Sequence, residues 1–368
     1  MDGLLRAEPT RRHMEDGTKP VYNPAVAVEI RTESDPVQPG SPGPARPTLA
    51  NYWHPIGLAE EVTDQPRRFT LLNEPVVAFR HDGGVSAFKD LCIHRGAALS
   101  LGWITDGRLT CPYHGWQYDH TGACVKIPAL PEGQSIPKRA RAIPYQATEA
   151  YGLVWVAMDE PVAPIPTWPD DAWNDPEYHA FLSYRCTWSS SAGRAVENFM
   201  DFSHFPFVHP GLLGSPDRAV IDPKHVHEVV MTDFGLRYGY EQEEPGALYE
   251  GLNTYEYSLY LPFTIHFKRI QPDGKVTFVS LITQPTSDTE AELYTFILRN
   301  HSLEIDDPVF GEFTNTVMDQ DRPVVESQRP LEIPVDLREE LHLKVPDANA
   351  VAYRRLLGGI DQIDAFMP

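Results

Sequence analysis

Cysteine, basic residues and long apolar runs are all scarce in this chain. Four cysteines in 368 residues exclude a disulfide framework and favour a reducing, cytoplasmic compartment. No apolar run reaches about 18 residues, which argues against a transmembrane helix, and the charged N-terminus lacks the apolar segment of a secretory signal. Lys and Arg number 31 against 52 Asp and Glu, a net charge of −21. A chain this acidic is a poor partner for nucleic acid or an anionic membrane, and we expect neither.

Nucleotide-binding fingerprints are also missing. No G-x-G-x-x-G string follows a predicted strand, and no Walker A string is present. The chain therefore shows no nicotinamide or flavin site of its own. If it performs redox chemistry on a substrate, its electrons must come from a separate protein.

Composition divides the chain into three predicted parts. Residues 1–48 are rich in proline and poor in apolar periodicity, which predicts a flexible arm. Residues 49–160 alternate short apolar runs with turn signals such as 81–84, which predicts a small all-β domain. Residues 161–368 combine helical patterns with long strands, so the predicted class of the whole chain is α+β. The strands expected in this last part are 253–261, 264–270, 276–282 and 292–299.

Two closely spaced Cys/His pairs carry the most specific signal. Cys92-Ile-His94 is separated by 16 residues from Cys111-Pro-Tyr-His114. A structural zinc site more often pairs Cys with Cys and His with His, whereas here each pair contains one of each. This pattern favours a [2Fe–2S] cluster with two Cys on one iron and two His on the other. The alternatives are a zinc knuckle or four unrelated residues.

A second constellation suggests a mononuclear metal site. A helix is predicted over 191–205, ending near Pro206, and it would place Glu197, Asp201 and His204 on one face. The chain would then turn to bring His209 beside His204. Two imidazoles and one carboxylate form a ligand set for Fe(II) that leaves positions open for O2. The alternative is a polar helix face with two structural histidines. Spacing alone leaves three candidate carboxylates open, namely Asp319, Asp321 and Glu326.

The cysteine and histidine pairs resemble the pattern of Rieske ferredoxin domains, and residues 50–360 resemble the catalytic (alpha) subunits of Rieske non-haem iron oxygenases. The resemblance implies an N-terminal all-β Rieske domain followed by a helix-grip (START-like) catalytic domain with an antiparallel sheet. It also implies a [2Fe–2S] cluster and a mononuclear Fe(II). The implied cluster ligands are Cys92, His94, Cys111 and His114.

The same resemblance assigns the remaining site residues. In the family, the third iron ligand is the Asp five residues before a Glu, which selects Asp321 over Asp319 because of Glu326. The first two iron ligands are then His204 and His209. The family's bridging Asp, three residues before the first iron His, corresponds to Asp201. An Asn near the iron corresponds to Asn198.

Three strings, at 111–119, 197–210 and 351–355, resemble a smaller homo-oligomeric branch that contains methylxanthine N-demethylases, saxitoxin hydroxylases and O-demethylases. This resemblance implies an O2-dependent monooxygenase that forms a homotrimer and acts on a small (hetero)aromatic or alkaloid-like substrate with N- or O-demethylation. Electrons would come from a separate NAD(P)H reductase that carries flavin and an iron–sulfur centre. The alternatives are C–H hydroxylation without dealkylation, ring dihydroxylation, and pure electron transfer with a degenerate second domain.

Overall fold

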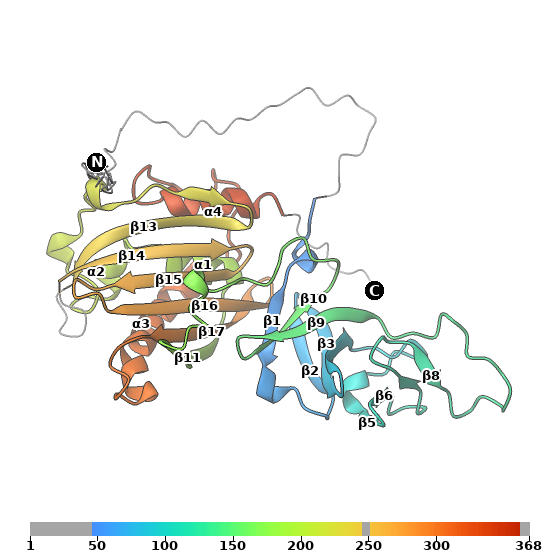
Figure 1. The fold of residues 1–368 in the computed structure, drawn as a ribbon. Helices are drawn as coiled ribbons and strands as arrows, with labels where there is room; N and C mark the ends of the chain where they lie inside the picture. The colour runs from blue at the N-terminus through green and yellow to red at the C-terminus, as the bar shows by residue number, and fades with distance from the viewer. Residues whose placement is uncertain (1–45, 245–250, 361–368) are drawn as a thin grey trace, which may run out of the picture. The chain divides into compact units, whose positions relative to one another are not determined.

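The structure, a computed structural model, describes residues 46–244 and 251–360 (Figure 1). Nearly all of the predicted arm, residues 1–48, lies outside the described residues, and the domain boundaries at 48 and 160 stay predictions. Within the described residues the strands form three antiparallel sheets. Short 3-10 helices lie at Leu49–Asn51, Ala59–Glu61, Leu99–Leu101, Pro169–Asp171, Pro216–Arg218 and Pro223–His225.

Two sheets form the N-terminal β region, as predicted. The larger has the order β1-β10-β9-β4-β3-β2, and the smaller has the order β5-β6-β7-β8. The predicted turn at 81–84 joins β3 to β4. The bounds are β1 His54–Leu58, β2 Arg67–Leu71, β3 Glu74–His81, β4 Gly84–Lys89, β5 Trp103–Thr105, β6 Arg108–Thr110, β7 Gln117–Tyr118, β8 Cys124–Lys126, β9 Pro144–Ala150 and β10 Leu153–Ala157.

A seven-stranded antiparallel sheet dominates the C-terminal region. Its order is β11-β17-β16-β15-β14-β13-β12. The four strands expected from the sequence are all present as β14 to β17, and β16 extends five residues beyond its expected end. The bounds are β11 His179–Trp188, β12 Val230–Thr232, β13 Gly235–Glu244, β14 Gly251–Tyr260, β15 Thr264–Ile270, β16 Val276–Ser287 and β17 Glu290–Arg299.

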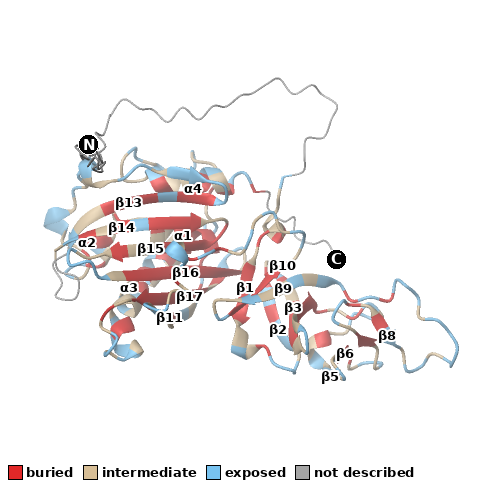
Figure 2. Cartoon of the chain, viewed as in Figure 1, coloured by how far each residue is buried: buried red, intermediate tan, exposed pale blue. Residues whose placement is uncertain are grey.

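The α-helices pack on one face of this sheet (Figure 1). They are α1 Ala192–Met200, α2 Phe205–Val208, α3 Asp307–Ser327 and α4 Ala348–Leu357. Apolar side chains of the helices and of the inner sheet face form the largest buried cluster, which appears as red strands and helix faces in Figure 2. The observed architecture therefore agrees with the expected α+β class. None of the described helices is long and apolar enough to cross a membrane.

The predicted single helix over 191–205 is wrong. Helix α1 ends at Met200, and Asp201 has extended dihedral angles of φ −80° and ψ 140°. Its carboxylate accepts hydrogen bonds from the backbone N–H groups of Ser203 and His204. An Asp side chain that bonds nearby N–H groups competes with helix continuation, which explains the break. Pro206 lies in the first turn of α2 instead of ending α1.

The outer face of the sheet is also covered. Trp155 of β10 and Trp168 of the proline-rich 161–178 segment pack with Phe278 and Tyr294 of β16 and β17. The amide of Gln284 donates to the carbonyl of Thr70 at 2.9 Å. The seven-stranded sheet is thus buried on both faces over β16 and β17.

Candidate metal centres

The two Cys/His loops share one backbone geometry. In each loop the amide of a glycine donates to the carbonyl of the cysteine four residues earlier, from Gly96 to Cys92 at 2.8 Å and from Gly115 to Cys111 at 3.0 Å. Both glycines have a φ near +70°, a left-handed conformation that L-side chains rarely adopt. The sequence therefore folds the two loops alike, and each presents one thiol and one imidazole.

The structure places the two cysteines next to each other and the two histidines next to each other. Cys92 and Cys111 are buried, whereas His94 is half-buried and His114 is exposed. The two imidazole rings lie 4.6 Å apart between centroids, and Trp116 stacks on His94 at 4.5 Å. The buried Nδ1 of His94 has no hydrogen-bond partner among the described residues. Thiols inside and imidazoles outside fit a [2Fe–2S] cluster whose histidine-bound iron faces the surface.

A tyrosine adds a polar contact to this site. The hydroxyl of Tyr118 lies 3.1 Å from the Sγ of Cys92, and both groups are buried. Burial raises the pKa of the Cys111 thiol, and the neighbouring Cys92 raises it further. In a cluster both sulfurs are thiolates, so Tyr118 would donate to the Cys92 sulfur. Hydrogen bonds to ligating sulfurs are among the features that set a cluster's potential.

The second site forms where the end of α1, the α2 turn and the middle of α3 meet. The Nε2 atoms of His204 and His209 lie 3.3 Å and 3.0 Å from the Oδ1 of Asp321. All three ligand atoms lie within 4.8 Å of one another. His209 and Asp321 are buried, and the side chain of His204 is 14% exposed. These are the three residues expected as iron ligands.

The opposite nitrogen of each imidazole is held by an acceptor. Nδ1 of His204 donates to the carboxylate of Asp201 at 2.9 Å, and Nδ1 of His209 donates to the amide oxygen of Gln320 at 2.8 Å. Because both acceptors fix a proton on Nδ1, both Nε2 atoms are left as lone-pair donors. Those Nε2 atoms and Oδ1 of Asp321 are buried and make no hydrogen bond of good geometry within the described residues. Three convergent, unsatisfied ligand atoms fit a mononuclear metal.

The electrostatics of this site also favour a cation. Burial raises the pKa of Asp321, but the imidazoles of His204 and His209 more than offset this, so the pKa lies below its usual value. Burial lowers the pKa of His204, but Asp201 and Asp321 raise it to about 9 in the metal-free chain. Two ionised carboxylates thus enclose one imidazole, and a divalent ion can take the place of its second proton.

The structure separates the remaining candidates. Asp319 is exposed, and its carboxylate accepts a hydrogen bond from the hydroxyl of Tyr184 at 2.9 Å. Glu326 accepts from the backbone N–H of Ser189 at 2.9 Å. Neither belongs to the converging set. Asn198 lies on α1, and its backbone carbonyl accepts from the amide of Asp201 at 3.1 Å, so its expected role beside the iron stays a prediction.

Comparison with known proteins agrees with this geometry over most of the chain. Residues 52–144 match the Rieske [2Fe-2S] domain, and residues 188–360 match the vanillate O-demethylase oxygenase C-terminal domain. Methylxanthine N1-demethylase NdmA of Pseudomonas putida is 32% identical over 324 residues, covering 85% of this chain and 89% of that protein. Methylxanthine N3-demethylase NdmB of the same organism is 31% identical, with coverages of 77% and 83%.

The chain is a Rieske oxygenase. The fold of this oxygenase agrees with solved structures as well. The structure of NdmA with caffeine has a TM-score of 0.75 and 31% identity, covering 84% of this chain and 90% of that chain. Dicamba monooxygenase has a TM-score of 0.69 at 21% identity, which shows the shared fold.

Membership in this family establishes the class of chemistry. The oxygenase is an O2-dependent oxidoreductase with a Rieske [2Fe–2S] cluster and a mononuclear iron. It is a monooxygenase that acts on small molecules, and its relatives include demethylases. Delivery of electrons by a reductase is typical of the family.

Several contacts of the oxygenase were not foreseen in the sequence. Gln320 holds His209, Tyr118 contacts Cys92, and the helix α4 contacts α1. The sequence offers one signal for Gln320, since it directly precedes the candidate ligand Asp321. The other two bring together residues far apart in the chain, and no spacing rule predicts them.

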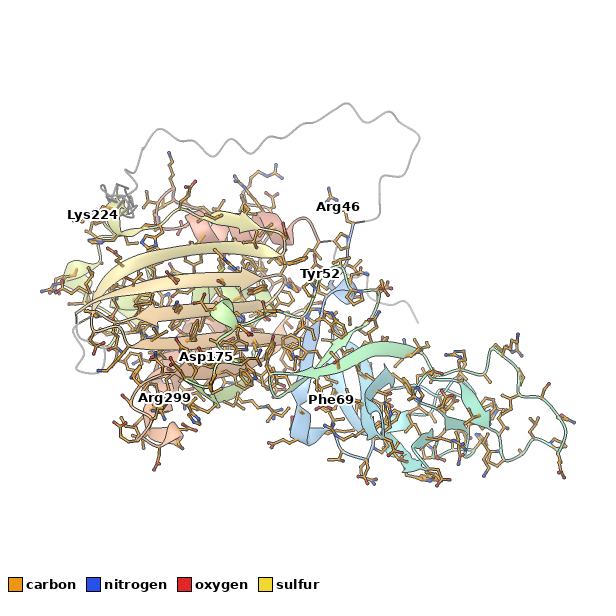
Figure 3. All side chains as sticks on the ribbon, viewed as in Figure 1. Arg46, Tyr52, Phe69, Asp175, Lys224 and Arg299 are labelled. Atoms are coloured by element: carbon orange, nitrogen blue, oxygen red, sulfur yellow. The ribbon has the colours of Figure 1, made fainter. Side chains whose placement is uncertain are left out.

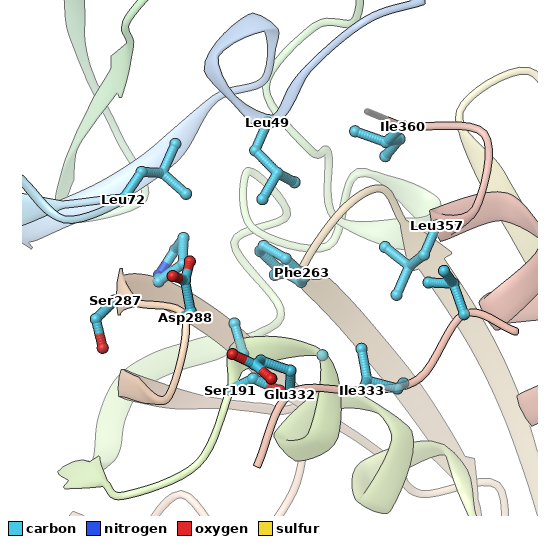
Figure 4. Close-up of a pocket in the computed structure, with 14 residues that line it drawn as sticks. Leu49, Leu72, Ser191, Phe263, Ser287, Asp288, Glu332, Ile333, Leu357 and Ile360 are labelled. Carbon is cyan, nitrogen blue, oxygen red and sulfur yellow. The ribbon is translucent and has the colours of Figure 1, made fainter. Parts of the chain in front are cut away.

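A separate cavity of about 70 Å³ lies beside the start of α1 (Figure 4). Its wall mixes apolar side chains, among them Leu49, Phe263 and Leu357, with the carboxylates of Asp288 and Glu332. The lining set contains none of the three converging ligands His204, His209 and Asp321. We therefore assign no part of the reaction to this cavity.

Proposed function

We propose that this oxygenase hydroxylates a methyl group on nitrogen or oxygen of a small (hetero)aromatic or alkaloid-like compound. The observation that carries the proposal is the convergence of His204, His209 and Asp321, three residues that would hold an iron and would leave other coordination positions free. The identity to two methylxanthine N-demethylases supports the substrate class. When bound, the iron supplies the activation of O2.

The overall reaction balances with electrons from NAD(P)H. The substrate methyl, O2, two electrons and two protons give a hydroxymethyl group and one water. The hydroxymethyl compound then breaks its C–N or C–O bond and releases formaldehyde, and the heteroatom keeps a proton. The chain has to bind the substrate, exclude water from the site and deliver the electrons one at a time.

Aromatic side chains lie on the elements that carry the three converging residues and on the strands packed against them. Phe205 meets His204 edge-on at 4.9 Å, and Phe202 stacks on Tyr240 at 4.4 Å. Phe199, next to Asn198 on α1, stacks on Phe267 at 5.5 Å. Aromatic walls supply a large apolar contact area and favour other aromatic rings in offset or edge-on geometry.

Product analysis tests the reaction type. The purified oxygenase should be incubated with a surrogate flavin and iron–sulfur reductase, NADH and a panel of N-methyl and O-methyl heteroaromatic compounds. We expect formaldehyde in a 1:1 ratio to the dealkylated product. A hydroxylated product without formaldehyde would instead support C–H hydroxylation without dealkylation, and a cis-diol would support a ring dioxygenase.

We further propose that electrons pass between subunits of a homotrimer. His114 is exposed at the tip of its loop, and the side chain of Asp201 is 31% exposed while its carboxylate holds His204. An exposed imidazole on one copy and a reachable carboxylate on another can form one hydrogen-bonded bridge. Such a head-to-tail contact closes into a ring when the rotation per subunit allows it.

Complementation tests this arrangement. The His94→Ala variant should lose the relay and keep the iron, and the His204→Ala variant should do the reverse. Each variant alone should be inactive, whereas oligomers reassembled from the mixture should recover part of the activity. Background activity in verified mixed oligomers of folded subunits would show that electrons stay within one chain.

A further inference from the structure

Helix α4 contains residues 351–355, which have no part in the proposed reaction. Arg354 on this helix is 2% exposed and reaches across to α1. Its Nε and Nη2 atoms donate to the two carboxylate oxygens of Glu197 at 2.6 Å and 2.7 Å. A bidentate pair of this kind fixes orientation as well as distance. Glu197 lies one helical turn before Asp201, at the end of α1 that leads into the iron site.

The pair is part of a charge-balanced network in which both arginines are buried and the side chain of Glu340 is 31% exposed. Glu340 accepts from Arg354 at 2.5 Å and from Arg194 of α1 at 2.6 Å. Arg194 is also 2% exposed, and its Nη1 lies 3.6 Å from Glu197. Two arginines and two glutamates therefore cancel in charge. Removing one partner of such a network leaves a buried charge uncompensated, so the arrangement of α1 against α4 has little freedom.

A second contact from α4 holds the last residue of α1. The carbonyl of Met200 lies at the helix end, where intrahelical partners run out. It accepts from the amide of Asn349 at 2.7 Å and from the hydroxyl of Tyr238 at 2.7 Å. Asn349 and Tyr238 are both buried. The next residue is Asp201, whose carboxylate meets His204.

We propose that Arg354 and Asn349 are positioning residues for electron delivery. They hold the C-terminal end of α1 at two points, Glu197 and Met200, and so set where the Asp201 carboxylate lies. The inference rests on the proposed role of Asp201 as the bridge to His204. A hydrogen-bonded electron route depends on distance and direction, and a misplacement of about 1 Å in a reacting group can cost on the order of 100-fold in rate.

The test separates electron entry from electron delivery in the full-length, iron-loaded oxygenase. Variants Arg354→Met, Arg354→Lys and Asn349→Leu are compared with the wild type. Arg299→Met is the matched control, because Arg299, labelled in Figure 3, is 1% exposed. It donates to the carbonyl of Ser302 at 2.6 Å and to Asp307, the first residue of α3, at 3.0 Å, and its side chain donates to no residue of α1 or α4 within the described residues. Two rates are measured, which are reduction of the cluster by the reductase and its reoxidation on mixing with substrate and O2.

We expect cluster reduction and iron content to match the wild type in every variant. Reoxidation should slow about 10- to 100-fold in Arg354→Met and Asn349→Leu. It should slow less in Arg354→Lys, which keeps the positive charge but loses the bidentate hydrogen bonds to Glu197. Arg299→Met should reoxidise at the wild-type rate even where its melting temperature falls. If Arg354→Met does not fold, Arg354→Lys and Asn349→Leu decide the question.

Two results overturn the proposal. One is unchanged reoxidation in the α4 variants, and the other is equal slowing in Arg299→Met, which would mean general loosening. The Asp201→Asn variant distinguishes failure of the proposed bridging role of Asp201 from failure of the positioning role of α4. If Asp201→Asn keeps wild-type reoxidation, the bridging role fails and this inference fails with it. If it slows reoxidation while the α4 variants do not, only the positioning role fails.

Discussion

The amide of Gln320 should control how tightly this oxygenase holds its mononuclear iron. Gln320→Leu removes the acceptor that His209 Nδ1 meets at 2.8 Å, at a ring with no solvent exposure. An unsatisfied buried N–H costs about 1–3 kcal/mol. The imidazole can avoid this cost by moving its proton to Nε2, but Nε2 then cannot bind metal. Either way iron binding is penalised, and loss of such an orienting partner typically weakens metal affinity about 10- to 100-fold. That range is about 1.4–2.7 kcal/mol, consistent with the first figure.

Iron retention against a competing chelator measures the effect. Enzyme purified anaerobically is titrated with chelator, and mononuclear iron is counted per cluster, whose visible spectrum serves as the internal reference. Asn315→Leu is the matched control, because Asn315 is an amide on the same helix that accepts from Ser183 at 2.8 Å and does not hold an iron ligand. Gln320→Glu replaces the amide with a stronger, charged acceptor and should retain iron at least as well as the wild type.

The reasoning is refuted if the Gln320→Leu enzyme loses its iron only at the chelator concentration at which the wild type loses it. It is equally refuted if Asn315→Leu loses iron to the same extent, because the effect would then belong to α3 packing. If the Gln320→Glu enzyme loses iron at a lower chelator concentration than the wild type, the strength of the hydrogen-bond acceptor is not the controlling property.

Three further outcomes are expected. Asp321→Asn should lose mononuclear iron and keep the cluster spectrum, whereas Asp319→Asn should keep both, as iron analysis and absorbance will show. Tyr118→Phe removes the hydroxyl that lies 3.1 Å from Cys92 and should lower the cluster's midpoint potential in a redox titration, because the more negative reduced form loses a donor. Burial lowers the pKa of His266 to about 3, so only the unfolded chain binds this proton between about pH 6.5 and 3, and stability falls as the pH falls. His266→Phe should reduce that slope by about 1.4 kcal/mol per pH unit in denaturant unfolding.

The cluster loops could be predicted because their chemistry is local. Two pairs, each with one thiol and one imidazole two or three residues apart, imply one ligand set, and Gly96 and Gly115 supply the positive φ that both loops need. The long strands β14 to β17 could also be predicted from the sequence, since the apolar alternation and the flanking turn residues of each strand are local signals. Both kinds of signal act over a few neighbouring residues.

The helix at the iron site could not be predicted from spacing. The i, i+4, i+7 pattern of Glu197, Asp201 and His204 suits a helix, but Asp201 bonds the backbone of Ser203 and His204 and ends it. Periodicity records which residue types recur, and it does not record whether a short polar side chain will compete for backbone N–H groups. The choice of Asp321 over Asp319 needed the family resemblance for a similar reason, because both lie on α3 and only packing decides which one is buried.

The break in the helix is also what makes the site usable. A continuous helix would turn Asp201 and His204 by the angle that 3.6 residues per turn dictates, and the carboxylate could not cap the backbone of His204 while holding its Nδ1. Because α1 ends at Met200, its last carbonyl becomes available to Asn349 and Tyr238, and Asp201 moves to a partly exposed position. The same local competition therefore places the Asp201 carboxylate against Nδ1 of His204, leaves the Asp201 side chain 31% exposed, and frees the Met200 carbonyl to accept from Asn349 of α4.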